Sequence, residues 1–241
     1  MKKTFFVTGL LLIVGNITLL AQNPTVQDYL KWAEVKMQQE DYAGAITECT
    51  KAVDANVYSV EAYVLRGQVY GKQRNYVQAF KDYTHALSLD PNKASVYFFR
   101  GMLHYERSEF EQAIADFSQA IRIDSEIKNA YFYKAQAHVK LENYEEAIAD
   151  FSKVIEIDSY FADIYYYRGK TKSAMTDNNG AIADFTEAIK QYPEIAKYYK
   201  ERGLTYTLVQ DYQKAKADFE KAIEIDPALT EEIDALKDLF L

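Results

Sequence analysis

The sequence of 241 residues lacks what a disulfide framework, a thiolate metal cluster or a basic surface would need. Its one cysteine, Cys49, has no partner for an internal disulfide and cannot form a thiolate cluster by itself. The three histidines, His85, His104 and His138, have no spacing that would converge on a metal ion. Lysine and arginine number 28 against 36 aspartates and glutamates. The resulting net charge of −8 argues against a nucleic-acid binder, which usually has a basic surface.

Catalytic motifs are missing as well. No serine or cysteine stands in a nucleophile elbow, and no glycine-rich phosphate loop occurs. Most carboxylates fall on the surfaces of predicted helices, where solvation is the ordinary state. We therefore expect a protein that is not an enzyme and that has no cofactor and no catalytic or metal site.

One long apolar run is present, at the N-terminus. Lys2 and Lys3 precede residues 5–20, which are apolar apart from Thr8, Asn16, Thr18 and two glycines, and the small residue Ala21 follows. This layout is typical of a secretory signal peptide, so we expect cleavage of residues 1–21, with 22–25 as a short linker. An uncleaved membrane anchor is disfavoured because a span usually needs ~20 apolar residues. We expect an exported protein, periplasmic in a Gram-negative source, with secretion as an alternative.

The rest of the chain repeats itself. One segment recurs every 34 residues without insertion, and its shared alanines are Ala45, Ala79, Ala113, Ala147, Ala181 and Ala215. Counted from Val26, the six repeats are 26–59, 60–93, 94–127, 128–161, 162–195 and 196–229. Each repeat contains two amphipathic stripes of helical period separated by a polar turn. Residues 230–241 form a further stripe, which we interpret as a helix that covers the last repeat.

Two columns of residues in this register predict internal contacts. Small residues at repeat position 8, such as Gly169, would let the two helices of a repeat approach closely, with Ala181 as a candidate contact and the rings of Tyr165 and Phe185 around it. Position 7 is a cation in repeats 2–6 and position 23 is an aspartate, as in Arg168 and Asp184. We expect ion pairs between these two columns, and bidentate ones where the cation is arginine.

The period and the aromatic, glycine, alanine and proline pattern resemble the tetratricopeptide repeat (TPR) family over about 85% of the chain. The resemblance implies an all-α solenoid: six helix-turn-helix repeats in a right-handed superhelix, plus a C-terminal capping helix. It also implies a scaffold that binds a peptide or protein segment in its concave groove. The alternative role is a structural subunit of an envelope complex or a homo-oligomer that uses the same faces.

By this resemblance, repeat positions 2, 5, 9, 12 and 13 line the groove. The candidate partner-binding residues are Phe98, Met102, Tyr105, Phe132, Gln136, Tyr166, Lys170, Lys197 and Lys200. Large apolar side chains at such positions predict either a binding surface or packing between repeats. The late lysines predict a place for a carboxylate, such as a chain terminus. The expected partner is a protein or peptide, not a nucleic acid, and no membrane span is expected after cleavage.

Overall fold

The computed structural model describes residues 24–161 and 163–240, without the side chains of 236–240. The predicted signal segment 1–21 lies outside these residues. The described part consists of helices joined by short turns, and none of its helices is long and apolar enough to cross a membrane. The helices are α1 Val26–Gln38, α2 Tyr42–Ala55, α3 Val60–Lys72, α4 Tyr76–Leu89, α5 Ala94–Glu106, α6 Phe110–Ile123, α7 Lys128–Lys140, α8 Tyr144–Ile157, α9 Ile164–Ala174, α10 Asn178–Gln191, α11 Ala196–Leu208, α12 Tyr212–Ile225, the 3-10 helix η1 Pro227–Leu229 and α13 Thr230–Phe240.

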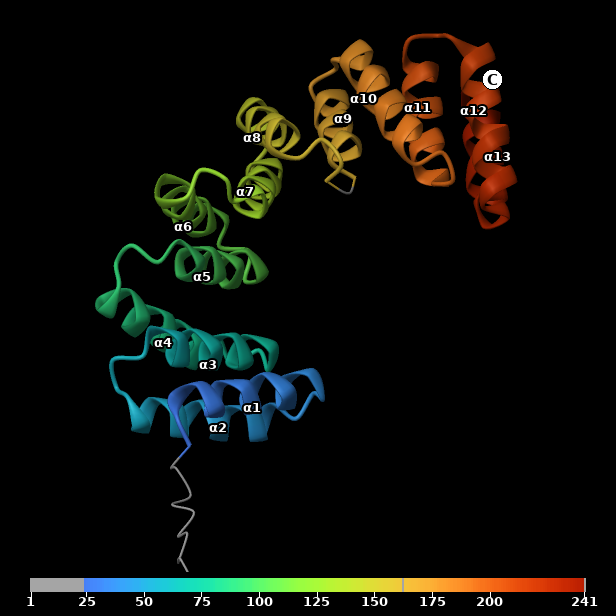
Figure 1. The fold of residues 1–241 in the computed structure, drawn as a ribbon. Coiled ribbons are helices and arrows are strands. Elements are labelled where there is room, and N and C mark those ends of the chain that lie inside the picture. The colour runs from blue at the N-terminus through green and yellow to red at the C-terminus, as the bar shows by residue number, and fades with distance from the viewer. Residues whose placement is uncertain (1–23, 162, 241) are drawn as a thin grey trace, which may run out of the picture.

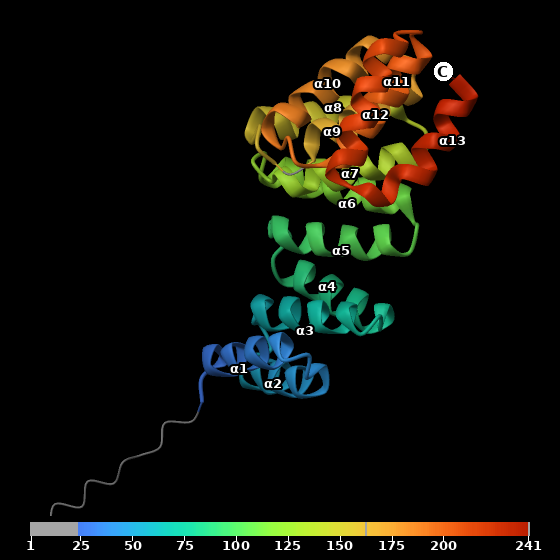
Figure 2. The same cartoon turned by 90° about the vertical axis from the view of Figure 1, so that its right-hand side faces the viewer.

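These helices form hairpins that stack in chain order. Each odd-numbered helix from α1 to α11 packs against the next even-numbered helix, and each even-numbered helix packs against the following hairpin. Figures 1 and 2 show the stack curving from α1 at one end to α13 at the other. The predicted all-α solenoid is therefore confirmed.

Local sequence explains where the helices begin. Thr25 and Asp28 form the expected capping box: the Asp28 N–H donates to the Thr25 hydroxyl, and the Thr25 N–H donates to the Asp28 carboxylate at 2.8 Å. In every hairpin turn, the residue two places before the second helix has a positive φ, between 57° and 63°. These residues are Glu40, Arg74, Ser108, Glu142, Thr176 and Gln210.

The close approach of paired helices depends on glycine, and the nearest neighbour of that glycine is the aromatic ring of the second helix. A Cβ atom built on Gly169 would lie 2.9 Å from Phe185 Cε1 and 3.2 Å from the Asp184 Cβ. The atoms nearest to Gly169 therefore belong to Phe185 and Asp184 rather than to Ala181. An edge of a buried ring occupies the space that a side chain at position 8 would take. The same relation holds for Gly67 with Tyr83, Gly101 with Phe117, and Gly203 with Phe219.

The predicted ion-pair column is present in all five repeats. Arg168 donates from Nε and Nη2 to both carboxylate oxygens of Asp184, at 2.9 and 2.7 Å. The bidentate geometry recurs in Arg66–Asp82, Arg100–Asp116 and Arg202–Asp218. Lys134 makes a single contact of 3.1 Å to Asp150. Arg168 also donates from Nη1 to the Ser152 hydroxyl at 2.9 Å, so this residue ties its own hairpin to the preceding one.

The two ends of the stack differ. At the C-terminal end, Ile233 of α13 is fully buried against the last hairpin. At the N-terminal end, Trp32 and Val35 of α1 are each 44% exposed. The residue equivalent to Val35 is no more than 5% exposed in the other five repeats, because the preceding hairpin covers it there. α1 thus presents an apolar face that none of the described hairpins covers.

Candidate functional site

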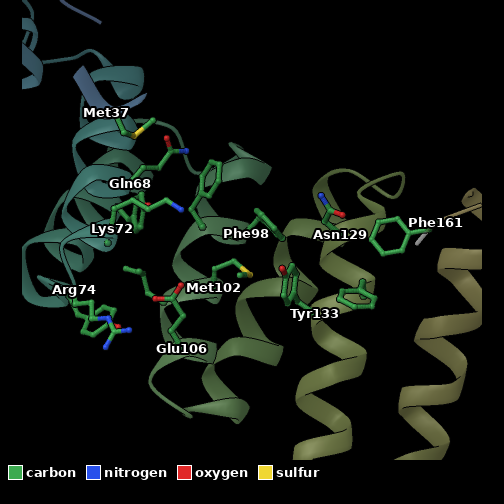
Figure 3. A pocket seen from close by; sticks show the side chains of 16 residues that line it. Met37, Gln68, Lys72, Arg74, Phe98, Met102, Glu106, Asn129, Tyr133 and Phe161 are labelled. Carbon is green, nitrogen blue, oxygen red and sulfur yellow. The ribbon is translucent and has the colours of Figure 1, made fainter. Parts of the chain in front are cut away.

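The concave side of the first four repeats contains a cavity of about 880 Å³. One wall comes from α3 and α4 and the other from α7, with α5 as the floor between them and Met37 of α1 at one end (Figure 3). Phe98 and Met102 of α5 lie between the two walls, and Asn129 and Phe161 lie at the far end (Figure 3). The cavity therefore spans several hairpins rather than lying inside one.

The repeat register explains which side chains line this cavity. The lining residues at positions 2, 5, 9, 12 and 13 are Asn129, Phe98, Phe132, Gln68, Met102, Met37, Gly71, Lys72 and Glu106. These are the positions that the family resemblance assigns to the groove. Three of the candidate residues, Phe98, Met102 and Phe132, line the cavity. The other six, Tyr105, Gln136, Tyr166, Lys170, Lys197 and Lys200, lie outside its lining.

The aromatic candidates also pack between neighbouring repeats. The ring centroid of Phe132 lies 5.2 Å from that of Tyr167 in the next repeat. Tyr166 lies 5.6 Å from Tyr198 in the same way. Burial raises the pKa of Tyr166 to about 12. The position-5 rings are half-buried, so each contributes to the stacking of hairpins and keeps only part of its surface in the groove.

The late lysines already contact carboxylates of this chain. Lys170 Nζ lies 3.3 Å from Glu201 Oε1 on the next repeat. Lys197 Nζ donates to Asp163 at 2.8 Å and lies 4.8 Å from the centre of the Tyr166 ring. Lys200 Nζ donates to Glu232 of α13 at 3.0 Å. A carboxylate ligand at this end would have to compete with these three internal partners.

Three charged residues at the first half of the groove are differently placed. Lys72, Arg74 and Glu106 line the cavity, and their side chains are exposed. No described residue of opposite charge lies within ion-pairing distance of Lys72, Arg74 or Glu106. None of the three is among the candidate residues predicted from the sequence, although Lys72 and Glu106 occupy position 13 of their repeats. Their shared register position was the signal that could have found them.

Two histidines and the cysteine are packed within the repeats. His104 Nδ1 lies 2.7 Å from Glu109. His138 faces Asp150 from 3.9 Å, and burial lowers the pKa of this histidine. Cys49 is buried, which raises the pKa of its thiol to about 12 and suits an unreactive core residue. Within residues 24–161 and 163–240, no group of three or more His, Cys, Asp or Glu side chains is arranged to hold a metal ion.

The fold and the groove together define a class of protein: an α-solenoid of stacked helical hairpins with a concave surface. Family models described as tetratricopeptide repeat match residues 60–93 and 196–229, 98–160, and 163–194. The chain belongs to the tetratricopeptide repeat family. Members of this family generally serve as non-catalytic scaffolds for protein–protein interaction.

Solved structures share this fold at low sequence identity. YrrB, described as a TPR protein with an unusual peptide-binding site, is 23% identical with a TM-score of 0.70, over 78% of this chain and 97% of that chain. The C-terminal part of a TPR repeat-containing protein from Cytophaga hutchinsonii is 21% identical with a TM-score of 0.75, over 89% of each chain. Pseudomonas aeruginosa pilF is 14% identical with a TM-score of 0.73, over 88% of this chain and 97% of that chain. A search of curated protein sequences found no match.

Proposed function

We propose that this protein is an exported scaffold that binds a peptide or an extended protein segment in the concave groove of repeats 1–4. The observation that carries the proposal is the cavity of about 880 Å³, which has an apolar floor and polar side chains on its walls. Phe98, Met102 and Phe132 offer apolar contact to a ligand side chain. The Gln68 and Asn129 amides can pair with the N–H and C=O groups of an extended backbone.

The division of apolar and polar groups suits a segment better than a small rigid ligand. The cavity extends over helices of four consecutive hairpins, so a ligand that fills it must be elongated. An extended segment exposes backbone groups that need partners once water is removed, and the wall amides provide them. The peptide-binding site described for YrrB, which shares the fold, is consistent with this proposal.

A selection from a random peptide library on the purified protein tests the proposal. We expect enriched peptides whose binding weakens in Met102→Ala, because this change removes apolar contact from the groove floor. Leu204→Ala is the matched control: Leu204 has the same repeat position in repeat 6 and lies outside the cavity lining. Thermal melting of both variants checks that each still folds. Absence of enrichment, or equal binding to the two variants, would contradict a binding groove here.

Export is supported by the basic start and the apolar residues 5–20 of the sequence. Expression of the full chain, cell fractionation and N-terminal sequencing test it. We expect a mature chain that begins at or near Gln22 in the envelope fraction. An intact N-terminus in that fraction would favour the anchor, and an intact chain in the cytoplasm would contradict export.

A second candidate role, assembly with further copies of the chain, is favoured by the apolar N-terminal face. Trp32 and Val35 are each 44% exposed, and the residue equivalent to Val35 is buried in every later repeat. Trp32 also occupies position 7, which is a cation in repeats 2–6. Light scattering of the wild type and of Trp32→Arg distinguishes the roles. A wild-type oligomer that becomes monomeric in the variant supports assembly, whereas a monomeric wild type contradicts it.

A further inference from the structure

We infer that the groove is selective for a segment that carries a carboxylate beside a large apolar side chain, and that Lys72 and Arg74 recognise this carboxylate. The inference rests on the proposed function, and it assigns the charge recognition to the first half of the solenoid rather than to the late lysines. Cations of the concave surface that already have an internal partner are less available to a ligand than those without one.

The cations in the second half are neutralised within the chain. Lys170, Lys197 and Lys200 contact Glu201, Asp163 and Glu232 at 3.3, 2.8 and 3.0 Å. Each pair joins one repeat to the next, or joins the last repeat to α13. An incoming carboxylate would have to break such a pair and leave an internal carboxylate without its cation. The exchange of one partner for another gives little net attraction at this end.

The first half offers two cations without such partners. Lys72 is the last residue of α3, and Arg74 is in the turn that follows it. No carboxylate among the described residues lies within ion-pairing distance of either. The backbone of Arg74 is held in place, with φ 57° and its N–H donating to the Gly71 carbonyl at 2.8 Å, while its side chain is exposed. The backbone that carries the two cations is therefore ordered at the groove wall, and their exposed side chains are available to a ligand.

The apolar part of the site adjoins these cations. Gly71 allows α3 to approach α5, because a Cβ atom at this position would lie 3.1 Å from the Leu103 side chain. Figure 3 shows the Lys72 ammonium group extending from α3 toward Phe98, and Met102 lies on α5 as Phe98 does. A ligand whose large apolar side chain fills the space beside Phe98 would place its neighbouring residues at the Lys72 wall.

Glu106 restricts the charge of the ligand further. This residue ends α5, lines the same cavity and is exposed, with no described cation within ion-pairing distance. A uniformly acidic segment would be repelled by Glu106, and a uniformly basic one by Lys72 and Arg74. The groove therefore favours an isolated carboxylate whose neighbouring residues are neutral or basic.

The expected effect of each cation is moderate, because both are solvent-exposed. An exposed ion pair changes affinity by about two- to five-fold, and the effect falls as the salt concentration rises. The test extends the library selection from the proposed function. Peptides selected on the wild type should be enriched in aspartate or glutamate within a few residues of an aromatic or large aliphatic residue.

The decisive measurement compares selected peptides on two charge-reversal variants. Lys72→Glu with Arg74→Glu should weaken the binding of acidic peptides about ten-fold or more, and selection on this variant should enrich lysine or arginine instead. Lys140→Glu is the control: Lys140 has the repeat position of Lys72, is exposed and lies outside the cavity lining. Lys140→Glu should bind the same peptides within about two-fold.

Synthetic peptides with free and with amidated C-termini identify the source of the carboxylate. Loss of binding on amidation assigns the contact to a chain terminus, and unchanged binding assigns it to an aspartate or glutamate side chain. The inference is overturned if the selected peptides lack carboxylates, or if Lys72→Glu with Arg74→Glu binds them as the wild type does. In both cases the proposed function still holds if Met102→Ala weakens binding, so the two failures are distinguishable.

Discussion

Repeat 4 has the weakest ion pair of the column, and replacement of Lys134 by arginine should strengthen it. Lys134 reaches only one oxygen of Asp150, at 3.1 Å. The second oxygen, Oδ2, is buried and has no hydrogen-bond partner among the described protein atoms. Burial is also the main cause that raises the pKa of this carboxyl group. In Arg168–Asp184, by contrast, both oxygens accept from one guanidinium group, at 2.9 and 2.7 Å.

The gain from Lys134→Arg can be estimated from the missing hydrogen bond. A hydrogen bond to a charged group contributes about 1.5–3 kcal/mol to stability. The rotamer entropy lost on ordering hardly differs between the two residues, since lysine and arginine side chains each carry about 2 kcal/mol of it. Desolvation of the larger guanidinium group offsets part of the gain. We expect a net stabilisation of about 1 kcal/mol. For a chain of this size, that corresponds to a rise in melting temperature of roughly 2–4 °C.

Urea denaturation and thermal melting of Lys134→Arg and of the reciprocal change Arg168→Lys form the test. Arg168→Lys should destabilise by at least the same amount, because it removes one contact to Asp184 and the bond to Ser152. The pKa of Asp150 should fall in Lys134→Arg, since a bidentate cation favours the ionised form. An unchanged or lower stability of Lys134→Arg, together with a loss in Arg168→Lys, would show that the unpaired oxygen carries no penalty and that the reasoning is wrong.

Three further changes test the packing, the turns and the buried histidine. Gly169→Leu should destabilise by roughly 1–3 kcal/mol or more in urea denaturation, because even a Cβ atom at this position would lie 2.9 Å from Phe185; a wild-type midpoint would show that the ring can move aside. Thr176→Gly should raise the melting temperature by an amount equivalent to about 0.5–1 kcal/mol, because a β-branched residue is strained at φ 63°; a lower melting temperature would contradict that strain. Burial lowers the pKa of His138, so the unfolded chain takes up this proton first and stability should decline as the pH falls below about 6.5. His138→Phe should lose this part of the pH dependence in urea titrations, and an identical pH profile would refute the assignment.

The sequence predicted most of the scaffold because the 34-residue period places equivalent residues in equivalent environments. The Arg168–Asp184 pair followed from two columns 16 residues apart, and the structure contains it and its counterparts. The sequence placed Gly169, Ala181 and Phe185 at one helix crossing, but spacing alone does not show which of the two residues of the second helix lies nearest to the glycine. In the structure it is the ring of Phe185.

The candidate site was less predictable from the same register. Position 5, 9 and 13 side chains share a helix face, and this relation places Phe98, Met102 and Phe132 at the cavity. A lysine at such a position has an ion-pair partner only if a carboxylate of the neighbouring repeat lies close enough. The stacking of the hairpins sets that distance. Lys170 and Lys72 are both lysines at positions that the family resemblance assigns to the groove. Only Lys170 has a carboxylate of the same chain within ion-pairing distance, Glu201 at 3.3 Å.

The sequence by itself determined the helical hairpins, their number in the repeat region and the contacts within each repeat, because these depend on local periodicity and on side chains close together along the chain. The tertiary structure decided which end of the stack keeps an apolar face and where the concave surface opens into a cavity. It also decided which cations there remain available to a ligand. These properties arise from how successive hairpins are rotated against one another. The periodic pattern predicts the same local structure for every repeat and does not show that rotation.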